Sequence, residues 1–204
     1  MNNREALLDA AKRCLFETGY QRTTARDIAT EAGVSLAAIG YHFGSKEALL
    51  NAALIEAIGE WGNELGSALV FGAYDAETDP LKRFELFWTR VIELFDDYRQ
   101  MWKANFELLT IIDQLPDDVR QVIVDAQHMG REGMALLVQG LTVEDDARQT
   151  NVVGAFYQAL LLGLMVQWLS APQHAPSGRD LTDALRAILK TVEASGGSTV
   201  DSPE

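Results

Sequence analysis

Side chains that commonly catalyse reactions or bind metals are few in this chain and form no known pattern. The three histidines are His42, His128 and His174, and none lies four residues from another or in an H-E-x-x-H motif. No nucleophile elbow or phosphate-binding loop is present. The single cysteine, Cys14, excludes an intramolecular disulfide and a cysteine metal cluster. The sequence therefore predicts no catalytic residues, no metal and no cofactor, and an enzyme is the less favoured interpretation.

The most informative spacing lies within residues 24–46. Ala29 is followed four residues later by Gly33 and six residues after that by Ile39. In a helix-turn-helix a small residue lets two helices approach, a glycine makes the turn and a large apolar residue fills the junction. Thr24 and Asp27 are spaced for a capping box on the first helix. The pattern predicts a helix-turn-helix, although an ordinary pair of antiparallel helices would also fit it.

The second helix of such a unit would present its outer face to the major groove of DNA. Ser35 is placed to cap this helix. The N-terminal residues approach base edges, and here they are Ser35, Leu36, Ala37 and Ala38. The two alanines can offer only methyl contacts, for example to thymine. We therefore expect this helix to read bases with small side chains.

The ten residues after Gly40 carry a second motif. They read Tyr41-His42-Phe43-Gly44-Ser45-Lys46-Glu47-Ala48-Leu49-Leu50. Together with the threonine-rich entry at Thr23-Thr24 and the helix-turn-helix, this motif resembles the tetracycline-repressor (TetR) family of transcriptional regulators. The resemblance covers residues 4–54 approximately, and beyond them it is one of pattern only.

The resemblance implies which side chains contact DNA. Thr24 and Arg26 stand where family members contact the backbone or a base from the first helix. Tyr41, His42 and Lys46 stand where phosphate contacts are expected. For His42 the alternative is a histidine whose hydrogen bonds are satisfied inside the domain.

Two further positions follow from the same resemblance. Phe43 is expected in the core and not at the DNA. Gly40 departs from the family, which usually has a phosphate-binding tyrosine at that position. Because glycine cannot make that contact, more of the phosphate binding is expected to fall to Tyr41.

The net charge of −13 comes from 17 basic and 30 acidic residues. Residues 1–50 hold six basic and six acidic side chains, so the remainder carries the whole excess of acid. Such a neutral DNA-reading segment predicts a shallow dependence of binding on salt. The N-terminus lacks a signal-peptide core, and the longest apolar run, residues 159–166, is too short to span a bilayer. A soluble, cytoplasmic protein without membrane contact is expected.

Helical periodicity without a strand pattern predicts an all-α fold of about nine helices. We expect a helix-turn-helix DNA-binding domain over residues 1–48 and a helical ligand-binding and dimerisation domain over residues 49–194. Residues 195–204 are rich in Gly, Ser and Pro and predict a disordered tail. A long helix, residues 45–71 approximately, would link the two domains. Gly59, Gly62 and Gly66 would weaken its second half by about 1 kcal/mol each relative to alanine.

Bulky side chains from several predicted helices could line a cavity in the second domain. They are Trp61, Phe84, Phe87, Trp88, Trp102, Phe106, Met129, Phe156 and Tyr157. Small-molecule sites are usually apolar pockets with a few polar groups, and Glu107, Gln127, His128 and Gln158 are candidates for those groups. The set predicts a pocket for an apolar or aromatic ligand, which could also be cationic. An ordinary hydrophobic core is the alternative.

Residues 155–169 are apolar nearly all round, which requires burial on two sides. One side can face its own subunit and the other needs a partner, so with the last helix they predict a four-helix dimer interface. Its expected members are Phe156, Leu160, Leu164, Trp168, Leu185 and Leu189. The central core helix of a monomer is the alternative.

These expectations combine into a homodimeric repressor. Two readers related by a two-fold axis would bind a palindromic operator in double-stranded DNA. A ligand would release the operator by favouring one arrangement of the second domain. A ligand-independent regulator or an activator with the same DNA-binding domain is the alternative.

Overall fold

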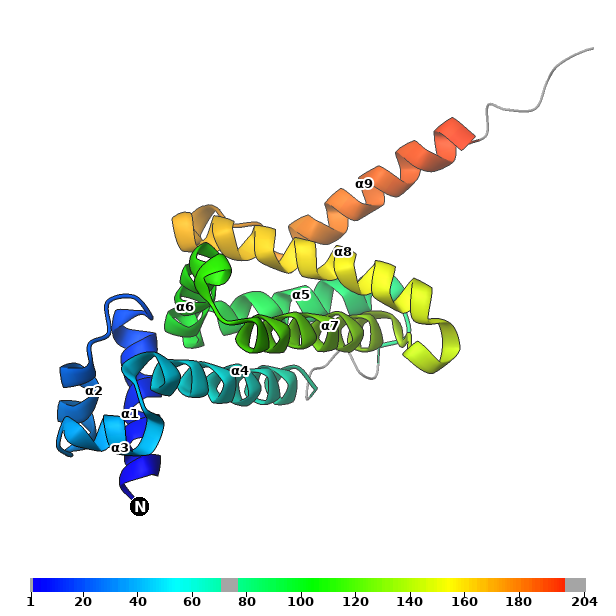
Figure 1. The fold of residues 1–204 in the computed structure, drawn as a ribbon. Coiled ribbons are helices and arrows are strands. Elements are labelled where there is room, and N and C mark those ends of the chain that lie inside the picture. Colours follow the sequence, from blue (N-terminus) through cyan, green and yellow to red (C-terminus); the bar gives the residue numbers. More distant parts are fainter. Residues whose placement is uncertain (1, 71–76, 197–204) are drawn as a thin grey trace, which may run out of the picture. The chain divides into compact units, whose positions relative to one another are not determined.

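The computed structural model describes residues 2–70 and 77–196. Within these ranges it contains nine α-helices, two short 3₁₀ turns and no strand (Figure 1). The elements are α1 (Asn3–Thr18), α2 (Ala25–Ala32), α3 (Ala37–Phe43), α4 (Lys46–Val70), α5 (Pro80–Asp97), α6 (Arg99–Ile111), η1 (Ile112–Gln114), α7 (Asp117–Gln139), α8 (Val143–Ser170), η2 (Pro172–His174) and α9 (Gly178–Gly196). The predicted all-α class with about nine helices is confirmed.

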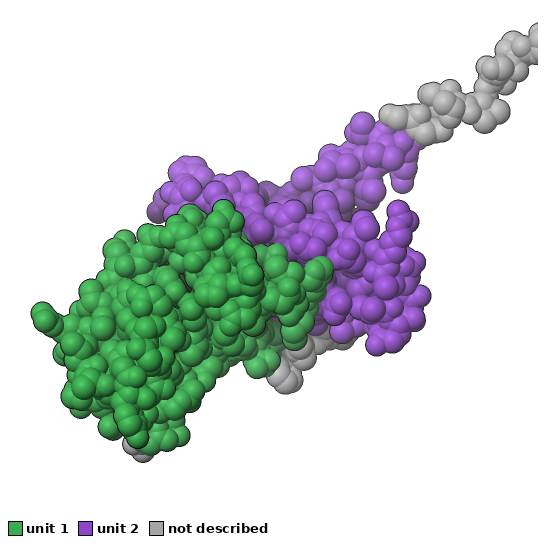
Figure 2. All heavy atoms as spheres, viewed as in Figure 1, with its two compact units in different colours: residues 1–67, 98–130 green, residues 68–97, 131–204 purple. Residues whose placement is uncertain are grey.

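The chain packs as two compact units (Figure 2). Unit 1 comprises Met1–Ser67 and Tyr98–Gly130, and unit 2 comprises Ala68–Asp97 and Arg131–Glu204. Helix α6 and most of α7 therefore pack with the helix-turn-helix, although the sequence assigned them to the second domain. Packing alone does not decide how binding functions are divided, so the boundary at residue 48 stays a prediction.

Unit 1 is built on α1, α2, α3 and the first part of α4, with α6 against α1. The side chain of Asn2 accepts from the backbone of Glu5 at 3.0 Å, and the Glu5 carboxylate accepts from the Asn2 amide at 3.1 Å, which closes a capping box at the start of α1. Gly19 ends the helix with a φ of 91°, a conformation that favours glycine. The apolar face between these caps lies in one core with side chains of the other four helices. That core includes Leu7, Ala11, Cys14, Ile28, Ile39, Leu50 and Ile111.

Unit 2 has an aromatic core formed by α5 and α8. Phe84, Phe87, Trp88 and Tyr157 contact one another with ring centroids between 5.4 and 6.3 Å apart. Such tilted and edge-on pairs stabilise a core beyond their buried area. The Tyr157 hydroxyl accepts from Gln139 Nε2 at 2.7 Å, and burial raises the pKa of this phenol. The core of unit 2 therefore uses four of the nine residues predicted to line a ligand pocket.

Helix α8 is long and strongly apolar. It has 28 residues and a mean hydropathy of 1.7 over its best window, so by length and composition alone it could cross a membrane. The expectation from run length missed this, because it counted only the uninterrupted apolar stretch at residues 159–166. Core helices of soluble proteins meet the same criteria.

Helix α9 begins with a cap and ends beyond its predicted boundary. The Ser177 hydroxyl accepts from the Asp180 amide at 3.2 Å, and the Asp180 carboxylate accepts from the Ser177 amide at 2.9 Å. The helix continues to Gly196, which corrects the predicted tail at residues 195 and 196. Residues 197–204, the rest of that predicted tail, lie outside the described residues.

Candidate nucleic-acid interface

Helix α2 starts at the predicted capping box. The Thr24 hydroxyl accepts from the Asp27 amide at 3.2 Å, and the Asp27 carboxylate accepts from the Thr24 amide at 2.9 Å and from its hydroxyl at 2.7 Å. The hydrogen bonds from the Thr24 side chain and backbone lower the pKa of Asp27 below its usual value. Thr24 is therefore first a structural residue, because its O–H is already donated within the domain.

The turn between α2 and α3 depends on Gly33. This residue has a φ of 67° and a ψ of 29°, the left-handed conformation that glycine adopts without steric cost. The Gly33 amide donates to Thr30 O at 3.1 Å, and the Val34 amide donates to Ala29 O at 3.0 Å. The predicted glycine turn is confirmed, and it aims α3 away from the axis of α2.

Helix α3 begins two residues later than Ser35, and the predicted serine cap is wrong. The N-cap is Leu36 in a helical conformation, without a side-chain cap. The first turn is closed instead by the main chain, with the Ala38 amide donating to Ser35 O at 3.0 Å and the Ile39 amide to Leu36 O at 3.2 Å. These three-residue bonds explain the shift, since a tight first turn satisfies the amides without a side-chain oxygen.

The two faces of α3 differ sharply in exposure. Ile39 is buried in the unit 1 core, as predicted for the residue that fills the helix junction. On the other side Leu36 and Ala37 are exposed, and the Tyr41 side chain is 85% exposed. Ala38 is partly buried against the core, so Ala37 has the freer methyl group. An exposed tyrosine with so little packing contributes little to stability and is available to a partner.

The remaining predicted DNA contacts lie on α3 itself and on the helices before and after it in the chain. His42 is half-buried and packs edge-on against the Tyr41 ring at 4.8 Å between centroids. Arg26 is exposed on α2. Lys46, at the start of α4, donates from Nζ to Thr23 O at 3.2 Å and lies 3.5 Å from Glu47. Because an ammonium has three donors, Lys46 can still bind a phosphate while holding Thr23.

Helices α1 and α4 hold the reading helices in place. Arg13 of α1 pairs with Glu31 of α2 at 2.7 Å, and the Arg4 guanidinium lies 5.1 Å from the centre of the Phe43 ring. The Ser45 hydroxyl caps α4 by accepting from the Ala48 amide at 3.0 Å. These contacts join α1 to α2 and to the C-terminal end of α3, and they close the first turn of α4.

Lys12 joins α1 to the middle of α4. Its Nζ lies 2.7 Å from Glu60, 3.3 Å from Glu56 and 3.4 Å from Asp9. The hydrogen bond with Glu60 is the main cause that raises the pKa of Lys12, and burial opposes it. The contacts of Lys12 and Arg4 could not be predicted from sequence, because a basic residue on the polar side of one helix does not reveal which side chains of a distant helix it meets.

The residues predicted to line a ligand pocket are distributed over both units. Trp61 and Trp102 pack edge-on at 5.1 Å between centroids in unit 1. Phe106 is half-buried on α6, whereas Met129 is 71% exposed on α7 and Phe156 is 57% exposed on α8. The other four form the aromatic core of unit 2. The ligand site composed of these nine residues stays a prediction.

The residues predicted for a dimer interface divide between two faces. Leu164 and Trp168 are buried within the chain, and Trp168 packs against Phe95 at 5.6 Å between ring centroids. Phe156 and Leu189 are exposed. Leu160 and Leu185 are partly buried. Leu164 and Trp168 thus serve the core of the chain itself, and the exposed face of α8 is formed by other residues.

Acid should weaken the α2 cap. Because the pKa of Asp27 is lowered by folding, its contribution to stability is present above its unfolded pKa and is lost as the pH falls through the folded one. We expect Thr24→Ala to lower the melting temperature at pH 7 by a few degrees and by much less at pH 3. Thermal melts of the variant beside Thr30→Ala, an exposed threonine on the same helix, measure the difference. An equal loss at both pH values would contradict the role of Asp27.

Comparison with known proteins identifies the arrangement. The family model for bacterial regulatory proteins of the tetR family matches residues 7–53. The transcriptional regulator BetI of Rhizobium meliloti is 29% identical over 203 residues, which are 98% of this chain and 94% of BetI. The nicotine-responsive transcriptional repressor HdnoR of Paenarthrobacter nicotinovorans is 27% identical over 188 residues, 91% of this chain and 92% of HdnoR.

Solved structures share the fold. A transcriptional regulator from Saccharomonospora viridis, crystallised in complex with choline, superposes with a TM-score of 0.62 at 23% identity, over 92% of this chain and 95% of that one. The matched family consists of transcription regulators and not of enzymes. The helix-turn-helix at residues 25–43, its family model and its full-length relatives agree, and the chain belongs to the tetR family of bacterial regulatory proteins.

Proposed function

We propose that this chain is a homodimeric, sequence-specific DNA-binding regulator that represses transcription from a palindromic operator. The observation that carries the proposal is the exposed face of α3, where the side chains of Ala37 and Tyr41 are open to solvent. In a helix-turn-helix the exposed face of the second helix enters the major groove. Tyr41, His42, Lys46 and Arg26 then bind backbone or base from α3 and its flanks, and Ala37 supplies a methyl contact to a base.

The dimer interface is proposed on the exposed apolar faces of α8 and α9. On α8, Val152, Phe156, Ala159, Gly163 and Val166 are exposed and follow one another at intervals of three and four residues. A helix places such positions on one side, and the small residues at its centre permit close approach of a second helix. On α9, Ile188, Leu189 and Val192 are exposed in the half of the helix that extends away from the rest of unit 2 (Figure 1).

A second copy of this chain fits that surface better than a lipid bilayer does. One side of α8 is already covered by its own unit, with Leu164 and Met165 buried. Its first turn is acidic, and Gln158 and Gln167 interrupt the apolar window. A membrane-spanning helix with polar side chains needs a polar partner for each of them within the bilayer. We therefore place the protein in the cytoplasm as a soluble dimer, where the operator is.

The proposed effector is a small apolar or aromatic molecule that enters the aromatic core of unit 2. Trp88 is fully buried, and its Nε1 has no hydrogen-bond partner among the described residues. A buried donor without an acceptor costs about 1–3 kcal/mol, so a ligand with an acceptor would be favoured there. The names of two similar proteins support an effector, since HdnoR is nicotine-responsive and the regulator from Saccharomonospora viridis binds choline. A ligand-independent regulator, or an activator, remains the second candidate.

Operator selection with the purified full chain tests the proposal. Random duplexes are selected for binding, and the winners are compared as full sites and as isolated half-sites. We expect an inverted repeat whose half-sites are about one helical turn apart, bound by two chains. Selection of no inverted repeat, or binding of one chain per duplex with the same affinity for half-sites, would contradict the dimeric reader. Adding candidate effectors to the same assay separates a ligand-released repressor from a ligand-independent one.

A further inference from the structure

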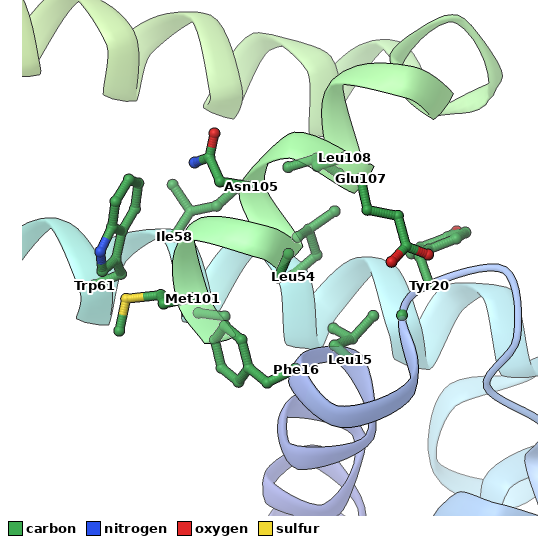
Figure 3. Close-up of a pocket in the computed structure, with 13 residues that line it drawn as sticks. Leu15, Phe16, Tyr20, Leu54, Ile58, Trp61, Met101, Asn105, Glu107 and Leu108 are labelled. Carbon is green, nitrogen blue, oxygen red and sulfur yellow. The ribbon is translucent and has the colours of Figure 1, made fainter. Parts of the chain in front are cut away.

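A small pocket lies within unit 1, where α1, α4 and α6 meet. Its volume is about 60 Å³. Phe16 of α1, Tyr20 in the turn after α1, Trp61 of α4, and Met101 and Glu107 of α6 are among the residues that line it (Figure 3). Of the nine bulky residues that the sequence predicted for a ligand site, Trp61 lines this pocket, and so does Glu107, one of the four predicted polar groups. Helix α1 was not expected to contribute. The pocket is therefore separate from the aromatic core of unit 2.

The pocket is chemically different at its two ends. Trp61, Met101 and Phe16 form an apolar end, and Glu107 reaches from α6 toward the chain at Tyr20 at the other end (Figure 3). The Tyr20 hydroxyl does not compete for an anionic group there, because it donates to Asn51 Oδ1 at 2.7 Å. An occupant would thus meet apolar and aromatic walls and one carboxylate.

The Glu107 carboxylate lies in a negative environment. It rests against Gly19, where even a Cβ atom would overlap it, so it sits directly at the C-terminal end of α1. The C-terminal end of a helix carries partial negative charge, which disfavours an anion and favours a cation. The side chain is 33% exposed, so solvent screens it only in part. The Glu107 carboxylate and the C-terminal end of α1 therefore together form a site where a positive charge is stabilised.

Arg22 only partly neutralises the negative charge of Glu107. It is the charged partner of Glu107 among the described residues, and their closest atoms are 3.7 Å apart, beyond a normal hydrogen bond. Its Nε is already donated to Thr18 O at 2.6 Å, which caps the end of α1. The Arg22 side chain is 71% exposed and can move without unpacking the core. A cation with an apolar body could therefore pair with Glu107 more closely than Arg22 does.

The pocket also borders the segment that leads into the reading helices. Gly19 accepts from the Thr23 amide at 3.2 Å and from the Thr23 hydroxyl at 2.7 Å. Thr23 in turn accepts from Lys46 at the start of α4, and Thr24 caps α2. Gln21 donates to Gln114 at 3.2 Å, which ties the same segment to the end of α6 through η1. Glu107 is thus connected to the cap of α2 through the six residues 19–24.

We propose that the pocket between α1, α4 and α6 binds a small organic amine in its cationic form, with Glu107 as counter-ion and the aromatic side chains around its apolar body. Aromatic faces attract cations as well as apolar groups, so the same walls serve both parts of such a molecule. A volume of about 60 Å³ restricts the occupant to a few heavy atoms. Its binding displaces Arg22 from Glu107 and alters the operator affinity through residues 19–24.

Binding of n-butylammonium to the full-length protein in the absence of DNA tests the site. We expect saturation-transfer NMR and calorimetry to detect it, and neutral n-butanol of the same length to bind about tenfold more weakly or not at all, since a tenfold ratio corresponds to one modest ionic contact. Glu107→Gln should remove the preference for the amine. Glu64→Gln, an exposed carboxylate on α4 outside the pocket, is the matched control and should keep it.

Arg22→Ala provides an independent variant, because Arg22 is exposed and its removal leaves the core intact. It should strengthen amine binding severalfold by freeing Glu107. Equal affinity for amine and alcohol, or an unchanged preference in Glu107→Gln, would overturn the site. The effect on the operator rests on the function proposed above and is measured separately. If the chain bound no operator, the proposed function would be wrong. The amine site would still be tested by the binding measurements without DNA.

Discussion

A Phe156→Asp chain is expected to be monomeric and to bind its operator about 100-fold or more weakly than the parent. Phe156 is 57% exposed, so a carboxylate there is solvated in the monomer. In a symmetric dimer the same carboxylate would appear twice in one interface, and each copy would lose water without a partner. Linking two DNA-binding units in one dimer raises the overall affinity by about 10² to 10⁴, and separate monomers lose this gain.

Sedimentation and fluorescence anisotropy of the same samples check this expectation. Val124→Asp is the matched control, because Val124 is an exposed valine on α7 outside the apolar stripe of α8. It should leave both the mass and the operator affinity unchanged. A Phe156→Asp protein that stayed dimeric would place the interface elsewhere, and a monomeric protein with parental affinity would remove the need for two readers.

An Ala37→Asp chain is expected to lose operator binding on the order of 100-fold while keeping its fold. Ala37 is exposed in the first turn of α3, where a carboxylate suits the helix dipole and burdens no core contact. In the major groove the same carboxylate faces phosphates and base acceptors, and like charges across an interface cost several kcal/mol. Stability and binding should therefore change in different directions.

Thermal melting and anisotropy on an unspecific duplex and on the selected operator separate the two effects. Ala147→Asp near the start of α8 adds the same charge at an exposed alanine far along the chain from the reader, and it controls for net charge. Parental operator affinity in Ala37→Asp would show that α3 does not enter the groove with this face.

The helix-turn-helix was predictable because its local chemistry agrees with its packing. Thr24, Asp27 and Gly33 act within a few residues of themselves, so their spacing already determines a cap and a turn. Ile39 lies in the core, as its spacing from Ala29 and Gly33 predicted for the residue that fills the helix junction. The shift at Ser35 shows the limit, since main-chain bonds of Ala38 and Ile39 closed the first turn without the hydroxyl.

The pocket of unit 1 could not be read from the sequence, because it depends on which helices meet. Phe16 lies on α1 and Tyr20 in the turn just after it, but nothing local indicates that α6 brings Glu107 to them. The aromatic residues of α5 and α8 have the same helical spacing whether they fill a core or line a cavity, and four of them pack together. Helical periodicity predicts which face of a helix is apolar, but it does not predict which distant helix that face contacts.

The glycines of α4 give that helix uneven stiffness along its length. Lys12 ties α4 to α1 through Glu56 and Glu60. A Cβ at Gly59, beside this contact, or at Gly62 or Gly66, beyond it, would meet no atom within 4 Å. Alanine would fit all three positions and strengthen the helix by roughly 3 kcal/mol in total, so close packing does not explain the glycines. The two turns of α4 after Glu60 are therefore more flexible than the part of the helix that Lys12 binds. Their backbone amides are expected to exchange with solvent sooner, and bending of α4 is expected to occur there and not in the part held by Lys12.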